Sequence, residues 1–365
     1  MKPRRLFPSP IMDEALLLAA CAEHNIKSPA HHAKGLWQHM CRHSGALPHG
    51  SIRDVPDLPE RMYRLLETTF APVTSTVVRE SPSSDGSTIK LLVKLQDDHL
   101  VEAVIMRYGG EGRKASNRAT LCVSSQVGCK MGCTFCATGT MGLSGNLTSG
   151  EILEQLMHAN RVLAPTGQRI RNIVFMGMGE PLDNYDSVRD AVRAMCDPNR
   201  FGLAWGHVTV STVGVVDRMR QMRVDMPLVN LALSLHAPTQ ESRCKIVPTA
   251  RQWHIDDLVA VLREHVATGK RVLIEYVAIK GLNETEEMAH ALGRLLSGLG
   301  REVTINLIPF NPTYNPSLGS QHEAPEIETV DAFAAIVYGE YGLRCTVRRE
   351  CGQDVGGRAG SWWWA

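Results

Sequence analysis

Three cysteines in a short loop are the residues of this chain best suited to chemistry. Cys129, Cys133 and Cys136 form a C-x3-C-x2-C pattern that begins directly after Gly128. Three thiolates at this spacing can ligate three irons of a cubane cluster and leave the fourth iron open. A structural zinc site is an alternative, but it needs four ligands, and no second C-x2-C pair or H-x3-H pattern follows. A redox dithiol made of Cys133 and Cys136 is a further alternative, which would not need Cys129.

Four glycine-rich or polar segments follow apolar, strand-like runs and are candidates for ligand binding. They contain Gly179-Glu180, Ser211, Ser234-Leu235-His236 and Asn311. Taken singly, each has a plain structural explanation: a turn glycine, a helix cap or a hydrogen-bonded core histidine. In parallel α/β folds, however, ligand sites form where the carboxyl ends of the strands meet. The repeated placement therefore favours one shared ligand, next to the cysteine loop.

Strand-like runs rich in Val, Ile and Leu alternate with helical patterns from residue 119 onward. The runs cover residues 119–125, 172–176, 207–211, 229–235, 271–277 and 303–309. A capping box, Thr148 to Glu151, marks the start of the first intervening helix. Such βα units indicate a parallel sheet covered by helices, either an open doubly wound sheet or a partial barrel. We expect an α/β fold with a partial, TIM-like (β/α)6 barrel.

The first part of the chain has a different rhythm. Helical patterns extend from Met12 to about Thr69, and alternating runs at 87–95 and 100–108 predict strands of a small sheet, with a turn at Ser84-Asp85-Gly86. We therefore predict four segments. They are a helical front region (1–75), a small β region or linker (76–114), the core (115–350) and a tail (351–365).

Composition and charge exclude several classes of protein. The chain has 365 residues, 39 Lys+Arg against 38 Asp+Glu and 44% apolar residues, which excludes a disordered or collagenous chain. No apolar run approaches the roughly 20 residues that a bilayer requires. Asp13 and Glu14 interrupt the early apolar run, so we expect a cytoplasmic protein, with an organelle transit peptide as the alternative. With a net charge of +1, RNA binding would depend on local clusters such as Arg107, Arg113, Lys114 and Arg118.

The cysteine loop and the segments behind the strands resemble the radical S-adenosylmethionine (SAM) superfamily. In that superfamily a CxxxCxxC loop holds a 4Fe-4S cluster whose fourth iron binds SAM. Together with the run from Ala119 to Cys129, ATLCVSSQVGC, the motifs are similar to those of the RlmN/Cfr family of adenine C2 methyltransferases. Members of that family act on large-subunit ribosomal RNA and, in the RlmN branch, on tRNA. The resemblance covers about residues 12–355, and it implies that the front region, 1–75, is an RNA-binding-like accessory domain and that 115–350 is the radical SAM core.

The resemblance implies a role for each motif. It implies that Cys129, Cys133 and Cys136 hold the 4Fe-4S cluster, and that SAM is bound by Gly179, Glu180, Ser211, Ser234, Leu235, His236 and Asn311. The expected partners are rRNA, with tRNA as a second RNA, and a low-potential electron donor of the flavodoxin or ferredoxin type. We expect no membrane partner and a monomeric chain.

The resemblance also implies two residues that act on the RNA. In the family, a methylated cysteine near the C-terminus carries the methyl group, and a second cysteine releases the product by attacking the carrier sulfur. Cys122 matches the releasing cysteine, and Glu102 matches the base that takes the C2 proton. Without the resemblance, Cys122 is an apolar residue of a strand and Glu102 a polar residue of an alternating strand.

The tail departs from the family pattern. Where the family has the carrier cysteine, in Ala-Cys-Gly-Gln-Leu, this chain has Ala359. Codons exist that encode Ala-Cys-Gly-Gln-Leu-Val and, read one base out of frame, give the Arg-Ala-Gly-Ser-Trp-Trp of residues 358–363. A frame slip is therefore one explanation. A second is that Cys351, followed by Gly352-Gln353, acts as carrier, and a third is that methyl transfer has been lost while SAM cleavage is kept.

Two other functions compete with adenine C2 methylation. Another radical SAM activity would need neither Cys122 nor the front part of the chain. A zinc-stabilised RNA-binding protein without catalysis would use the cysteine loop only for structure. The sequence alone leaves open whether C2 or C8 of adenine is methylated, and the resemblance to the RlmN branch favours C2.

Overall fold

The computed structural model describes residue 4 and residues 6–42, 51–108, 118–311 and 322–348. The chain divides into two compact units. Unit 1 comprises Met1–Val127, Gly145–Met178 and Asn184–Val208, and unit 2 comprises Gly128–Ser144, Gly179–Asp183 and Thr209–Ala365. Arg113, Lys114, Cys351, Ala359 and the rest of the predicted tail lie outside the described residues.

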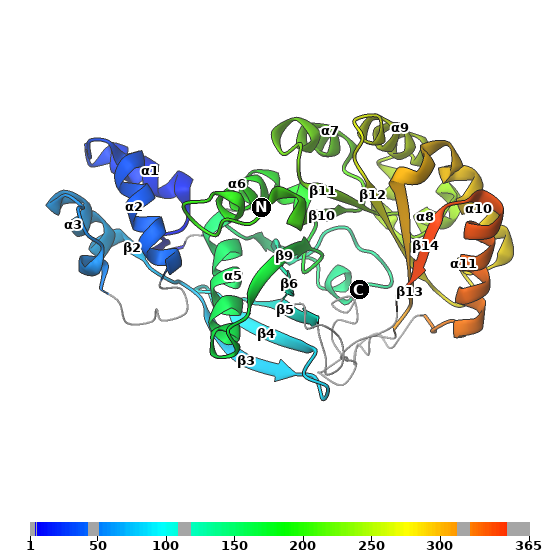
Figure 1. The fold of residues 1–365 in the computed structure, drawn as a ribbon, viewed down its shortest axis with the longest axis horizontal. Helices are drawn as coiled ribbons and strands as arrows, with labels where there is room; N and C mark the ends of the chain where they lie inside the picture. Colours follow the sequence, from blue (N-terminus) through cyan, green and yellow to red (C-terminus); the bar gives the residue numbers. More distant parts are fainter. Residues whose placement is uncertain (1–3, 5, 43–50, 109–117, 312–321, 349–365) are drawn as a thin grey trace. The chain divides into compact units, whose positions relative to one another are not determined.

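A mixed sheet forms the centre of unit 1 (Figure 1). Its strands lie in the order β3-β4-β5-β6-β9; the first four are antiparallel neighbours, and β6 and β9 are parallel. Leu91 and Val93 of β4 are fully buried, because alternate side chains of a strand face the core. The strands are β3 Thr76–Pro82, β4 Thr88–Lys94, β5 Leu100–Tyr108, β6 Arg118–Cys122 and β9 Arg169–Phe175.

The helices of unit 1 are α1 Glu14–Glu23, α2 Pro29–Arg42, α3 Glu60–Thr69, α5 Ser149–Leu163 and α6 Tyr185–Cys196. Short strands β1 Ser9–Pro10 and β2 Phe70–Ala71 pair in parallel. The predicted capping box is present, since Thr148 Oγ1 accepts a bond from the Glu151 N–H (3.1 Å) and the Glu151 carboxylate accepts one from the Thr148 N–H (2.9 Å). The capping box therefore sets the first residue of α5 where the sequence predicted it.

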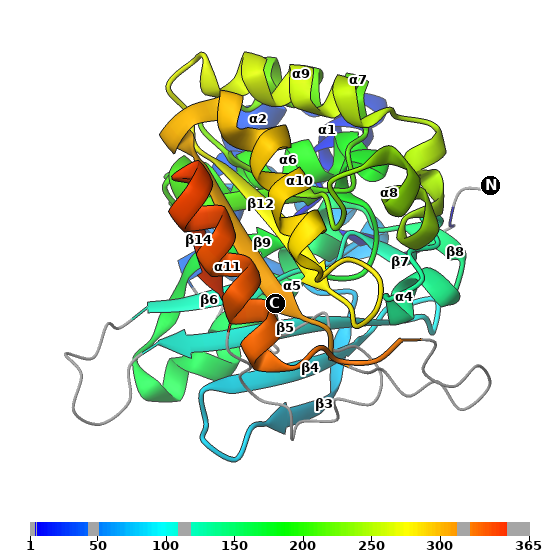
Figure 2. The same cartoon turned by 90° about the vertical axis from the view of Figure 1, so that its right-hand side faces the viewer.

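Unit 2 contains parallel strands joined by helices, as parallel pairing requires. The strands are β10 Val208–Thr212, β11 Asn230–Ser234, β12 Val272–Ala278, β13 Val303–Pro309 and β14 Arg344–Val347, each paired with the next. The helices are α7 Val216–Asp225, α8 Gln240–Ile246, α9 Ile255–Val266, α10 Glu286–Leu296 and α11 Ile327–Tyr341. Figure 2 shows α10 and α11 packed side by side.

The remaining elements are short. They are β7 Gln126–Gly128, α4 Ala137–Thr140, β8 Leu143–Asn146 and the 3-10 helices Ile52–Asp54, Ala164–Thr166, Pro181–Asn184, Trp205–His207, Pro248–Arg251 and Ser297–Glu302. In the part of the chain that the structure describes, no helix is long and apolar enough to cross a membrane.

The strands predicted from residue 119 onward are all present, with bounds shifted by at most three residues. The two predicted front strands, the turn at Gly86 and the early helices are confirmed as well. Strands β3 and β14 were missed. Both have a single neighbour and contain no buried residue, so they lack the apolar alternation by which a strand is found.

Candidate active site

The cysteine loop of unit 2 lies in an apolar cluster. Cys129 and Cys133 are buried, and half-buried Cys136 packs against the same group of side chains. The Cys129 N–H donates to the Gly142 carbonyl (2.8 Å), and the Cys136 N–H donates to the Cys133 carbonyl (3.1 Å). These backbone bonds fold the loop on itself. The three predicted ligands lie in or against the same apolar cluster of side chains.

Helix α4 starts directly after the third cysteine, and Gly139 lets it pack on the loop. A Cβ at this position would lie 2.8 Å from the Cys133 carbonyl oxygen, closer than side chains can approach backbone. The Gly139 N–H donates to the Cys136 carbonyl (3.0 Å). A residue without a side chain is therefore needed here to keep the shape of the loop.

Burial keeps the three thiols protonated when no metal is bound. It raises the pKa of Cys129 to about 12, raises that of Cys133 well above its ordinary value and raises that of Cys136. Metal binding must therefore release protons. Across the described ranges, no three His, Cys, Asp or Glu side chains are gathered as a single metal ion requires. The C-x3-C-x2-C pattern offers three thiolates, the number that ligate a cubane cluster with one open iron, whereas a structural zinc site takes four ligands.

Arg243 of α8 places a buried positive charge beside the loop. Its Nε donates to the Leu235 carbonyl (3.1 Å) and its Nη2 to the Val213 carbonyl, while Nη1 has no hydrogen-bond partner among the described residues. Burial lowers the pKa of Arg243 to about 10, and the nearby Cys133 opposes that change. A cationic donor with an unused N–H beside a predicted ligand thiol would suit an anionic cluster held by thiolates.

Gly179 and Glu180 lie at the start of a buried turn. Gly179 has a left-handed φ of 99°. The Glu180 side chain accepts bonds from the N–H groups of Leu182 (3.0 Å) and Val213 (2.9 Å). Burial raises the pKa of Glu180 to about 7. Because Val213 directly follows β10, these bonds join the glycine segment to the carboxyl end of that strand.

Three predicted polar residues lie at the carboxyl ends of strands of unit 2. Ser211 of β10 and Ser234 of β11 are on neighbouring strands, and their hydroxyl oxygens are 3.2 Å apart. Asn311 follows β13 and is half-buried. A pair of adjacent hydroxyl groups can bind the hydroxyls of a sugar, since each can donate and accept.

His236 connects this edge to the cysteine loop. It has a left-handed φ of 60°, and its ring meets Phe135 edge-on with 4.8 Å between ring centroids. Its Nδ1 accepts a bond from the Val277 N–H (3.2 Å), so the ring is neutral with its proton on Nε2. Burial lowers the pKa of His236 to about 3, which agrees with that state. Leu235, beside it, is buried.

Glu102 and Cys122 belong to unit 1 and share one face of its sheet. Lys90 and Cys122 both pair with Val104 of β5, and Glu102 is two residues from Val104, so the side chains of all four lie on the same side. The Lys90 Nζ is 2.6 Å from Glu102 Oε1. Burial raises the pKa of Glu102, and Lys90 opposes that change. The second oxygen, Oε2, has no hydrogen-bond partner among the described residues.

Sequence reasoning missed three residues that contact the predicted ones. They are Lys90, which pairs with Glu102; Arg243, which donates to the Leu235 carbonyl; and His322, whose Nε2 is 2.8 Å from Oγ1 of Thr134, a neighbour of Cys133 in the loop. The alternation of residues 87–95 identified the strand of Lys90 but not its partner. Arg243 has no signal, because charged residues are common in helices and their burial depends on tertiary packing.

Comparison with known proteins identifies the class of the protein. The sequence pattern of the Radical SAM superfamily matches residues 123–292, which include the cysteine loop and β9 to β12. A radical SAM methyltransferase from Sphaerobacter thermophilus, known from a crystal structure, is 36% identical, with a TM-score of 0.83 over 97% of this chain and 98% of that chain. The α/β radical SAM fold predicted from the sequence is thus confirmed.

Curated relatives identify the family. Ribosomal RNA large subunit methyltransferase N of Nitrosopumilus maritimus is 38% identical over 85% of this chain and 86% of its own length. Dual-specificity RNA methyltransferase RlmN 1 of Myxococcus xanthus is 41% identical over 89% of this chain and 86% of its own length. The chain belongs to the RlmN family of radical SAM enzymes. Enzymes of the radical SAM family use a 4Fe-4S cluster and SAM, the two cofactors that the sequence predicted.

Proposed function

We propose that this chain methylates C2 of an adenosine in 23S-type rRNA, with tRNA as a second substrate. The supporting observation is the identity of 38% and 41% to relatives named as rRNA and dual-specificity RNA methyltransferases, over 85% and 89% of this chain. Adenine C2 is an electron-poor carbon without a lone pair, so it cannot attack a SAM methyl group by ordinary displacement. The chemistry must come from the cofactors, and the protein must position them.

In this proposal unit 2 binds both cofactors. Cys129, Cys133 and Cys136 hold the 4Fe-4S cluster, which when bound supplies the electron for SAM cleavage. Arg243 Nη1, which has no hydrogen-bond partner among the described residues, would be a donor for that group. Gly179 and Glu180 bind the SAM amino group, the hydroxyls of Ser211 and Ser234 bind its ribose, and Leu235, His236 and Asn311 complete its pocket.

Unit 1 supplies the residues that act on the RNA. Glu102 takes the proton from adenine C2 through Oε2, the oxygen that Lys90 leaves free. Its raised pKa makes the carboxylate a stronger base, as general-base catalysis requires. Cys122, on the same face of the sheet, releases the methylated product from the carrier sulfur.

The proposed setting follows from the function. The partners are rRNA, tRNA and a flavodoxin or ferredoxin as electron donor, and the enzyme is a cytoplasmic monomer. We also propose that residues 1–75, with α1 to α3, form the accessory RNA-binding segment. The segments 76–114, 115–350 and 351–365 are proposed as the small β region, the radical SAM core and the altered tail.

Mass spectrometry of the RNA tests this function. A 23S-type rRNA transcript is incubated under anaerobic conditions with the reconstituted chain as written, and with a form whose residues 358–363 are replaced by Ala-Cys-Gly-Gln-Leu-Val. We expect 2-methyladenosine from the restored form. Product from the chain as written would assign the carrier role to Cys351. A restored form that cleaves SAM but leaves adenosine unmodified, or that yields 8-methyladenosine, contradicts the proposal.

A further inference from the structure

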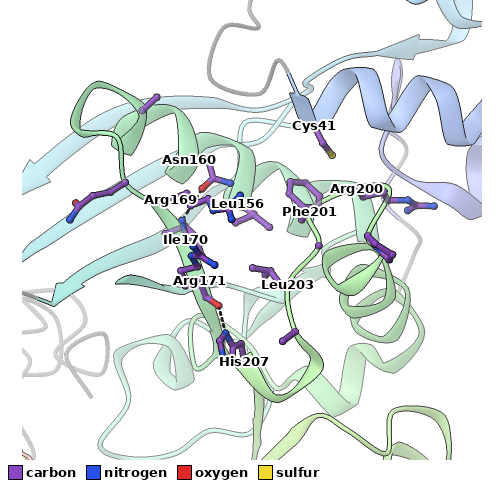
Figure 3. A pocket seen from close by; sticks show the side chains of 15 residues that line it. Cys41, Leu156, Asn160, Arg169, Ile170, Arg171, Arg200, Phe201, Leu203 and His207 are labelled. Carbon is purple, nitrogen blue, oxygen red and sulfur yellow. Dashed lines mark hydrogen bonds between the residues drawn. The ribbon is translucent and has the colours of Figure 1, made fainter. Parts of the chain in front are cut away.

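A pocket of about 610 Å³ opens in unit 1 at the amino end of β9 (Figure 3). Its walls are the end of α5, the first residues of β9 and the segment 198–207 after α6, with Cys41 of α2 at one side. The glycine-rich segment that begins at Gly177 follows the opposite, carboxyl end of β9. The pocket is therefore separate from the residues assigned above to cofactors or catalysis.

The lining of the pocket is positively charged. It contains Arg169, Arg171 and Arg200, and no Asp or Glu. Arg200 is already paired with Glu14 and Asp197 and stacks over Trp37. The exposed guanidinium groups of Arg169 and Arg171 have no acidic partner among the described residues. Two arginines are thus available for an anionic ligand.

Neighbouring strands add to this charge. Arg118 of β6 is the register partner of Arg169, and it lies over the ring of Tyr108. Arg107 of β5 donates to Gln168 (2.8 Å), which lines the pocket. Like charges opposite each other destabilise a sheet, and neither β6 nor β9 contains a carboxylate to offset them. A bound anion would remove this repulsion.

The inner wall suits a nucleobase. Phe201 is half-buried, and the buried side chains of Ile170 and Leu203 line the pocket beside it. Asn160 Oδ1 accepts a bond from the Ile170 N–H (3.0 Å), which leaves its Nδ2 as a donor. His207 Nδ1 donates to the Arg171 carbonyl (3.1 Å), which leaves Nε2 as an acceptor. An aromatic ring, a donor and an acceptor therefore lie beneath a rim of arginines.

We propose that this pocket binds one nucleotide of the substrate RNA, with its phosphate at Arg169 and Arg171 and its base against Phe201. The inference rests on the proposed RNA methyltransferase function. The seven residues of β9 span about 23 Å, a length of only a few nucleotides. An RNA segment can thus contact both ends of this strand, and the pocket would fix the register of the RNA.

Two variants test the two parts of the proposed contact. In R169A/R171A the affinity for a 23S-type rRNA transcript falls about tenfold at ~0.1 M salt, and the salt dependence decreases by the equivalent of about one neutralised phosphate. In F201L the affinity falls about fivefold, because base stacking is weakened, while the salt dependence stays unchanged. R79A/R193A is the matched control, since it removes two exposed arginines of unit 1 that do not line the pocket. Thermal unfolding checks that each variant is folded.

The outcomes separate this inference from the proposed function. If the chain with the restored tail binds and methylates the transcript but R169A/R171A binds as tightly as R79A/R193A, the pocket proposal alone is wrong. If the chain with the restored tail neither binds nor methylates RNA, the proposed function fails, and the pocket proposal fails with it. Titration with adenosine 5′-monophosphate tests whether the pocket binds a free nucleotide instead of a nucleotide of the RNA. Binding of this nucleotide that is lost in R169A/R171A, with unchanged RNA affinity, would assign the pocket to a free nucleotide and overturn the RNA assignment.

Discussion

Two buried groups of ionisable side chains, one in each unit, differ in how far the chain itself supplies their hydrogen-bond partners. In unit 1, Glu154 of α5 is fully buried, and its carboxylate accepts bonds from the N–H and hydroxyl groups of both Thr74 and Ser75. In unit 2, the thiols of the cysteine loop have raised pKa values, and Arg243 beside them has an unused N–H. The first group is complete within the chain, which indicates a structural role, whereas the second becomes complete only with a ligand.

Glu102 lies between these two extremes. One carboxylate oxygen is paired with Lys90, and the other has no hydrogen-bond partner in the described part of the chain. One oxygen is thus held in place, and the other is buried without a hydrogen bond from any described residue. If the comparison is correct, a substitution lowers activity most where the replaced side chain has hydrogen-bonding or ligating atoms without a partner in the chain.

The largest effect is expected at the cysteine loop. In Cys133→Ala one thiolate ligand is lost, so iron content after anaerobic reconstitution falls from about four to below one per chain, and SAM cleavage disappears. Cys244→Ala is the control, because Cys244 packs against the same apolar cluster but lies outside the motif. Iron analysis, absorbance and SAM cleavage are measured. A Cys133→Ala protein with full iron content and unchanged SAM cleavage would remove the basis of the proposed function.

A large effect confined to methyl transfer is expected at Glu102. Glu102→Gln removes the base while keeping the shape of the side chain, so 2-methyladenosine forms about 10²- to 10⁴-fold more slowly with the restored tail. Iron content and RNA-independent SAM cleavage stay unchanged. Glu80→Gln is the control, an exposed carboxylate on β3 of the same sheet. Equal methylation rates for the two variants would show that Glu102 is structural.

A smaller effect is expected at Arg243. Arg243→Met removes a positive charge near the cluster, which disfavours the more negative reduced state and lowers the midpoint potential by roughly 50–100 mV. Arg243→Lys keeps the charge and should recover most of the potential. A redox titration followed by electron paramagnetic resonance measures both. An unchanged potential in Arg243→Met at full iron content would place the charge too far from the cluster to act on it.

The sequence predicted most of the fold because the central strands have strong patterns. The apolar runs 271–277 and 303–309 coincide with β12 and β13 to within one residue. β12 is buried at nearly every position and reads as a continuous apolar run, whereas β13 buries alternate side chains and reads as an alternating run. The capping box at Thr148 fixed the start of α5 for a local reason, because its bonds join residues three apart. Edge strands β3 and β14 have no buried side chains and so carry no such pattern.

Contacts between segments distant in sequence were not predictable. The bond from Val213 to Glu180 and the hydroxyl pair of Ser211 and Ser234 depend on which strands are neighbours. The motifs predicted that these residues lie at one edge, but not which atoms meet. Arg243 was missed altogether, since nothing in its local sequence indicates that the side chain is buried.

The smallest effect on activity is expected for Glu154→Gln, because both oxygens of the Glu154 carboxylate accept hydrogen bonds within the chain, from Thr74 and Ser75. We expect full iron content and normal methylation but lower stability. Gln offers only one oxygen to the four donors, and an unsatisfied buried donor costs about 1–3 kcal/mol. Thermal unfolding of the variant against wild type measures the loss. A variant of unchanged stability would contradict the structural role assigned to this network.

The pH dependence of that loss provides a sharper test. Burial raises the pKa of Glu154 to about 7, above its ordinary value of 4.5. A carboxyl group with a raised folded-state pKa binds its proton more tightly in the folded protein, so wild type loses stability as pH rises from about 4.5 to 7. This contribution reaches about 3 kcal/mol and is absent from Glu154→Gln. The stability gap between wild type and variant should therefore shrink from pH 5 to pH 8. A gap that widens would mean that the four donors hold the carboxylate ionised, with a pKa below its ordinary value.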